Sequence, residues 1–140
     1  MKKRKGGILF ETALVLIILG ILFAFFSPNA YEMLFEGKSS AAKGEASALA
    51  TNVMQYTFEL NEYPASLNDL TEKVGNFGPW ATEEALTDPW GNLYQYQFDA
   101  ENGKAAVWSM GKNGSNDSGS PTTSGILNDD IGIVVTVMTY

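Results

Sequence analysis

Two adjacent carboxylates near the C-terminus, Asp129 and Asp130, have the residue type and spacing for binding chemistry in this 140-residue chain. No basic residue follows Lys112, so neither carboxylate has a cationic neighbour in the sequence. Calcium takes about six to eight oxygen ligands from carboxylates, side-chain amides and backbone carbonyls. The preceding loop supplies Asn113 and Asp117 as further oxygen donors. We predict a calcium site here, and the alternative is an acidic, solvated turn without an ion.

The composition argues against most catalytic chemistry. The chain contains no histidine and no cysteine, which excludes imidazole catalysis, thiol nucleophiles, Cys/His zinc sites and disulfides. No Gly-x-Ser-x-Gly motif or phosphate-binding loop occurs, so we predict that the protein is not an enzyme. An anchored hydrolase or binding protein is the weaker alternative. The net charge is −7 although residues 2–5 are all basic, so the remainder is strongly acidic and we expect no nucleic-acid binding.

One carboxylate, Glu11, lies inside an apolar segment. Residues 8–26 are nineteen residues long and carry no other charge. As a helix they would span roughly 28 Å, close to the hydrocarbon thickness of a bilayer. A carboxylate there costs about 2.5 to 3.5 kcal/mol unless it finds a partner. The segment offers no cation, so the partner must be headgroup water, the chain's own amine or another subunit.

Three interpretations of this N-terminus compete. The four cations at residues 2–5 are expected on the cytoplasmic side of a membrane, which suits a plain one-span anchor. A cleaved secretory signal fits less well, because the apolar stretch is long and no small-x-small cleavage site follows it. Cleavage near Gly6 and Gly7 is the third, and it would expose an amine able to pair with Glu11.

The leader resembles that of the type IV pilin and pseudopilin family. The resemblance rests on Lys2-Lys3-Arg4-Lys5-Gly6, followed by Gly7-Ile8-Leu9-Phe10-Glu11 and the apolar run. It implies that a prepilin peptidase cuts after Gly6, that the amine of Gly7 is methylated, and that Glu11, fifth in the mature chain, directs assembly. The same register places Gly20 fourteenth and Pro28 twenty-second, where the family typically carries Gly and Pro. Gly7 itself departs from the apolar residue usual at the first mature position.

The remaining pattern predicts an α+β fold. Pro28 should kink the helix, and a stripe beyond it steps by three or four residues to about Asn61. The stripe comprises Ala42, Ala46, Leu49, Val53, Tyr56 and Leu60. We expect a short helix after Ser66 that includes Leu67, Leu70 and Val74, a turn at residues 88–92, and strands at residues 93–98, 104–110 and 131–138. Residues 111–125, rich in Gly, Ser, Asn and Thr, should be mobile unless something ties them down.

The expected architecture is a pilin fold: a long N-terminal helix, half transmembrane and half amphipathic, packed on a small antiparallel sheet. Residues 1–6 would form the leader, 7–28 the transmembrane and assembly helix, and 29–62 the amphipathic helix. Residues 63–140 would form a periplasmic or extracellular globular domain with an αβ loop, the sheet and the calcium loop.

Within this family, the chain looks most like the major pseudopilin of type II secretion systems. The matching stretches are Tyr63-Pro64, Asp88-Pro89-Trp90-Gly91-Asn92, Ser109-Met110-Gly111-Lys112-Asn113-Gly114 and Asp129-Asp130-Ile131-Gly132. The resemblance implies five calcium ligands: the Met110 carbonyl, the Asn113 side chain, Asp129, Asp130 and the Ile133 carbonyl. Asn113 stands where the family more often carries aspartate, and Asp117 is the candidate to replace that charge.

The function so implied is a structural subunit that polymerises into a type II secretion pseudopilus and drives protein export across the outer membrane. Its partners would be further copies of itself, minor pseudopilins, the prepilin peptidase and an inner-membrane assembly platform. It would sit in the inner membrane by one span, with a periplasmic domain, before entering the filament. The alternative is a major or minor type IV pilin of a surface filament for adhesion, motility or DNA uptake, which the extended C-terminal strand favours.

Overall fold

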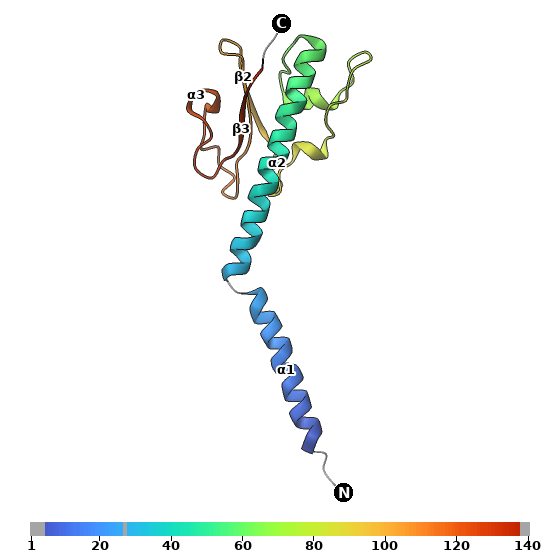
Figure 1. Cartoon of the computed structure of the whole chain (residues 1–140), viewed down its shortest axis with the longest axis vertical. Helices are drawn as coiled ribbons and strands as arrows, with labels where there is room; N and C mark the ends of the chain where they lie inside the picture. Colours follow the sequence, from blue (N-terminus) through green and yellow to red (C-terminus); the bar gives the residue numbers. More distant parts are fainter. Residues whose placement is uncertain (1–4, 27, 138–140) are drawn as a thin grey trace. The chain divides into compact units, whose positions relative to one another are not determined.

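The computed structural model describes residues 5–26 and 28–137, and the side chains of residues 7–26 and 31–137. The chain divides into two compact units, Met1–Gly37 and Lys38–Tyr140. The elements along the chain are coloured in order in Figure 1. They are α1 (Lys5–Phe25), α2 (Pro28–Leu60), the 3-10 helices η1 (Leu67–Thr71) and η2 (Glu84–Leu86), β1 (Gln95–Asp99), β2 (Lys104–Ser109), α3 (Pro121–Ser124) and β3 (Ile131–Thr136).

The first unit contains α1 and the beginning of α2. Its segment Gly7–Phe25 is long and apolar enough to cross a membrane, which fits a single-pass anchor. The described side chains of α1 are exposed. The predicted interruption is confirmed, because α1 ends at Phe25 and α2 begins with Pro28 at its first position, where proline loses no helical hydrogen bond.

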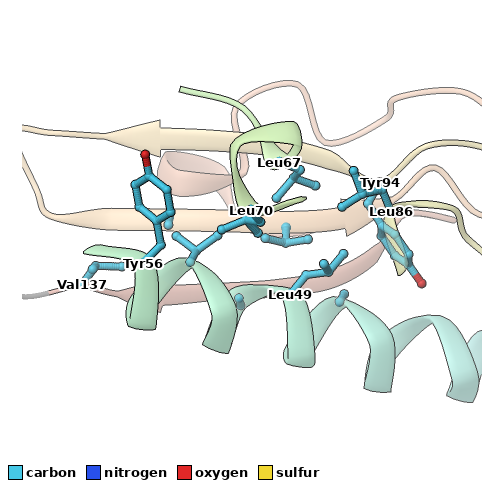
Figure 2. Close-up of a cluster of buried hydrophobic side chains, with 12 residues drawn as sticks. Leu49, Tyr56, Leu67, Leu70, Leu86, Tyr94 and Val137 are labelled. Carbon is cyan, nitrogen blue, oxygen red and sulfur yellow. The ribbon is translucent and has the colours of Figure 1, made fainter. Parts of the chain in front are cut away.

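The core of the second unit forms between α2 and one face of the sheet. Figure 1 shows the later part of α2 lying along the strands. The predicted stripe is buried from Ala42 to Tyr56, with Leu60 half-buried at the end of the helix. In Figure 2, Leu49 and Tyr56 reach from α2 toward Leu67 and Leu70 of η1. The helical period of the apolar residues therefore determines which face of α2 meets the domain.

The sheet has three antiparallel strands in the order β1-β2-β3. Gln95 pairs with Trp108 at one end of the β1–β2 hairpin, and Lys104 pairs with Thr136 in the β2–β3 ladder. The central strand β2 is almost entirely buried, since α2 covers one face of the sheet and α3 lies on the other. The predicted α+β pilin fold is confirmed.

Several predicted boundaries were wrong. The helix after Ser66 is a 3-10 helix that ends at Thr71, and Val74 lies beyond it, 43% exposed in a bridge with Phe77. The Asp69 carboxylate accepts the amide hydrogens of Ala65 and Ser66, which fixes the start of this short helix but adds no further turn. Strand β1 begins two residues later than predicted, and β3 ends at Thr136. Met138 lies outside the described residues.

Candidate functional site

The two ends of the predicted calcium loop lie against each other. Ser109 pairs with Ile131 at the end of the β2–β3 ladder. A Cβ atom placed on Gly111 would lie 2.1 Å from the carbonyl oxygen of Asp129, so only glycine allows this backbone approach. Its φ of +65° favours glycine for a second reason. The strand register therefore brings the segment that begins at Met110 next to the acidic pair.

Asp130 provides the best candidate ligand atom. The residue is 5% exposed, and its Oδ2 accepts the amide hydrogen of Ser118 at 2.6 Å. Its Oδ1 is buried without any hydrogen-bond partner. A buried carboxylate oxygen that has lost water and gained no donor is energetically unfavourable. A hard cation bound through oxygen would satisfy that atom, so the local chemistry fits calcium.

The other predicted side-chain ligands are arranged differently. The amide nitrogen of Asn113 donates to Asp117 Oδ2 at 3.0 Å, and its Oδ1 accepts the amide hydrogen of Ser115 at 2.8 Å. Asp129 is exposed. Among the described residues, no group of three or more acidic side chains is close enough to hold a metal ion. A cation at Asp130 would therefore depend on carbonyl and amide oxygens for most of its ligands.

Loop residues 111–125 are tied to the outer face of the sheet, a feature that the sequence left open. The indole nitrogen of Trp108 donates to Asn116 Oδ1 at 3.3 Å. The side-chain oxygen of Gln97 accepts the hydroxyl hydrogen of Thr122 at 3.1 Å. A further hydrogen bond closes the loop on itself, since the hydroxyl of Ser118 accepts the amide hydrogen of Leu127. Sequence analysis missed Gln97, although its place among polar residues alternating with aromatic ones in β1 signals a solvent-side or loop-side position.

The predicted cleavage residues Gly6 and Gly7 and the predicted assembly residues Glu11 and Pro28 lie in the first unit. Gly6 and Gly7 fall in the first turn of α1, Glu11 is exposed on the same helix, and Pro28 begins α2. The neighbouring Thr12 satisfies its own hydroxyl, which donates toward the carbonyls of Ile8 and Leu9 at 3.0 Å each. The basic residues 2–4 of the predicted leader lie outside the described residues.

An apolar anchor helix, an amphipathic second helix and a three-stranded antiparallel sheet with an acidic loop at its end together define a pilin-class subunit. The family model described as "Type II secretion system (T2SS), protein G" matches residues 29–129. The chain belongs to this protein G family of type II secretion systems, and the predicted resemblance to the major pseudopilin is confirmed.

Curated relatives extend the match over most of the chain. Type II secretion system core protein G of Pseudomonas aeruginosa is 32% identical over 139 residues, covering 92% of this chain and 97% of that protein. The protein of the same name from Vibrio cholerae is 31% identical over 123 residues, covering 81% and 84%. That from Xanthomonas campestris is 26% identical over 113 residues, covering 78% and 79%. No solved structure gives a significant match.

Proposed function

We propose that this chain is the major structural subunit of a type II secretion pseudopilus, with a mechanical rather than catalytic role. The observation that carries the proposal is α1, an exposed apolar helix with one carboxylate, in a chain of the protein G family. Exposed apolar surface of this extent requires lipid or other protein to cover it. Lipid would cover the helix of the free subunit, and the helices of neighbouring subunits would cover it in the filament.

The charge on Glu11 would direct assembly. After a prepilin peptidase removes residues 1–6, the new amine of Gly7 would pair with Glu11 of an adjacent subunit. In a low-dielectric helical core an unpaired carboxylate is unfavourable, so pairing would favour one register between subunits. Energy for polymerisation would come from an inner-membrane assembly platform, and minor pseudopilins would join the same filament. The basic leader would be retained on the cytoplasmic side, which supports a periplasmic position for the globular domain.

A complementation experiment tests this proposal. In the parent bacterium, deleting the gene should abolish export of secreted enzymes, and the wild-type gene should restore it. Glu11→Ala should yield a folded, membrane-bound subunit that neither cross-links into oligomer ladders nor restores export. Thr12→Val is the matched control, because it removes the adjacent polar group, which already bonds within its own helix. We expect Thr12→Val to assemble and export normally.

Two outcomes would contradict the proposal. Normal filaments from Glu11→Ala would refute the charge-pairing account. Undiminished export in the deletion strain, with loss of surface adhesion or motility instead, would support the surface-pilin alternative.

We also propose that the acidic loop binds calcium. Asp130 Oδ1 supports the proposal, as a buried oxygen without a donor. Asp129, the side chain of Asn113 and the carbonyls of Met110 and Ile133 would complete the ligand set. Asp117 would act through its hydrogen bond to Asn113. The bound ion would neutralise adjacent carboxylates and fix the loop against the sheet.

Thermal unfolding of the full chain in detergent micelles tests the calcium proposal. At a calcium concentration of 100 times Kd, binding should stabilise the folded state by about 2.7 kcal/mol relative to a chelator. Asp130→Asn should abolish this shift, since the amide keeps an acceptor for Ser118 but loses the charge. Asp99→Asn is the control, an aspartate in the β1–β2 hairpin that bonds to Asn102. An identical melting temperature of the wild type in calcium and in chelator would count against the site.

A further inference from the structure

One buried carboxylate links the turn at residues 88–92 to the end of β2. Asp88 is 5% exposed, and its Oδ1 accepts the amide hydrogens of Trp90 at 3.0 Å and Asn92 at 2.8 Å. Its Oδ2 accepts the hydroxyl hydrogen of Ser109 at 2.5 Å. The two oxygens therefore serve different segments, one closing the turn and the other contacting the strand end.

The hydroxyl of Ser109 continues the connection into the calcium loop. Ser109 is 0% exposed, and its Oγ accepts the amide hydrogen of Gly111 at 3.0 Å. The amide N–H of Gly111 can only donate, so the Ser109 hydroxyl accepts there and gives its own hydrogen to Asp88. The nitrogen of Gly111 and the carbonyl of Met110 belong to one planar peptide unit. Fixing the nitrogen therefore also fixes the orientation of the Met110 carbonyl.

The start of the loop also lies close to two other segments. On one side, Gly111 approaches the carbonyl of Asp129 so closely that no Cβ fits. Further along the loop, a Cβ on Gly114 would lie 3.8 Å from the side-chain nitrogen of Asn92, so the turn and the loop are also neighbours there. The start of the loop thus lies between the turn that Asp88 closes and the acidic pair.

We infer that Asp88 is a positioning residue for the cation proposed at this loop, acting through Ser109 and Gly111 on the Met110 carbonyl. The inference rests on the calcium proposal and assigns a role to residues that are not themselves ligands. Groups that orient metal ligands typically change metal affinity by about 10- to 100-fold when they are removed. A role confined to folding would instead change stability and leave the affinity of the folded protein unaltered.

Calcium titration of the full chain in detergent micelles, by isothermal calorimetry at a temperature where all variants are folded, separates these roles. Ser109→Ala removes the connecting hydroxyl. Asp88→Asn keeps a carbonyl for the turn amides but presents an amide that cannot accept the Ser109 hydrogen. Each should weaken calcium binding by about 10-fold or more. The double variant should bind calcium with about the same affinity as the single variant that binds it less tightly, because both changes break the same connection.

Thr57→Val is the matched control. Thr57 is fully buried on α2, and its hydroxyl donates within its own helix to the carbonyl of Val53 at 2.8 Å. This variant should lose stability yet bind calcium with wild-type affinity. Wild-type affinity in Ser109→Ala and Asp88→Asn, or an equal loss in Thr57→Val, would overturn the inference. A wild-type chain that binds no calcium would overturn the calcium proposal and this inference together, while the export experiment would still stand.

Discussion

At the scale of single residues, Tyr94 and Tyr96 differ in whether the phenol hydroxyl has a hydrogen-bond partner. Tyr94 donates to Glu45 Oε2 at 2.6 Å and lies 3.3 Å from the carbonyl of Ala42. The hydroxyl of Tyr96 is buried without a partner. Burial raises the pKa of both phenols, and the bonded Glu45 carboxylate raises the pKa of Tyr94 further. Both therefore remain protonated at neutral pH, but only Tyr94 uses its hydrogen to connect α2 to the sheet side of the domain.

Replacing these tyrosines should have unequal effects on the free energy of unfolding. Tyr94→Phe should cost about 1 to 3 kcal/mol, since it removes a hydrogen bond to a charged group. Tyr96→Phe should be neutral or stabilising, because it removes a buried hydroxyl that has no partner. Urea denaturation of the two variants beside the wild type measures both values. A larger loss for Tyr96→Phe than for Tyr94→Phe would contradict the assignment.

At the scale of elements, α2 presents two different surfaces within the second unit. Leu49 is 1% exposed and packs in the core, whereas Phe58, nine residues later on the same helix, is 77% exposed. The buried stripe holds the helix to the sheet by removing apolar surface from water. The exposed side of the helix contributes little to folding and remains available to other molecules.

Truncation of one residue on each surface should separate these contributions. Leu49→Ala should reduce the free energy of unfolding by about 2 to 5 kcal/mol, through lost burial and the cavity it leaves. Phe58→Ala should change it by less than about 0.5 kcal/mol, as is usual at exposed positions. Chemical denaturation followed by circular dichroism gives both numbers. A loss above 2 kcal/mol for Phe58→Ala would mean that this ring is packed in solution.

At the scale of the whole molecule, the two units divide the physical tasks. The buried hydrophobic residues among those described run from Ala42 to Val137, all within the second unit. The first unit contributes α1, whose apolar side chains are exposed from Ile8 to Phe25. The second unit therefore holds the core, and the exposed apolar helix of the first unit fits a membrane anchor. This division is the basis of the export experiment proposed above.

The sequence by itself determined the features that depend on local order. Residues 8–26 specify a membrane-length helix with Glu11 inside it, and the three-and-four spacing from Ala42 specifies the buried face of α2. Each follows from residue type and period alone, because neighbouring residues on a helix or strand have fixed relative directions. The acidic pair was likewise recognisable as a cation-binding candidate from its chemistry.

Only the tertiary structure decided which distant groups meet. Asp88 and Ser109 are 21 residues apart, and Gln97 and Thr122 are 25 apart. Oδ2 of Asp130 accepts the amide hydrogen of Ser118, 12 residues away in the sequence, and the side-chain amide of Asn113 donates to Asp117. Such pairings depend on strand register and on how the loop folds over the sheet. These are collective properties of packing, and no short stretch of sequence encodes them.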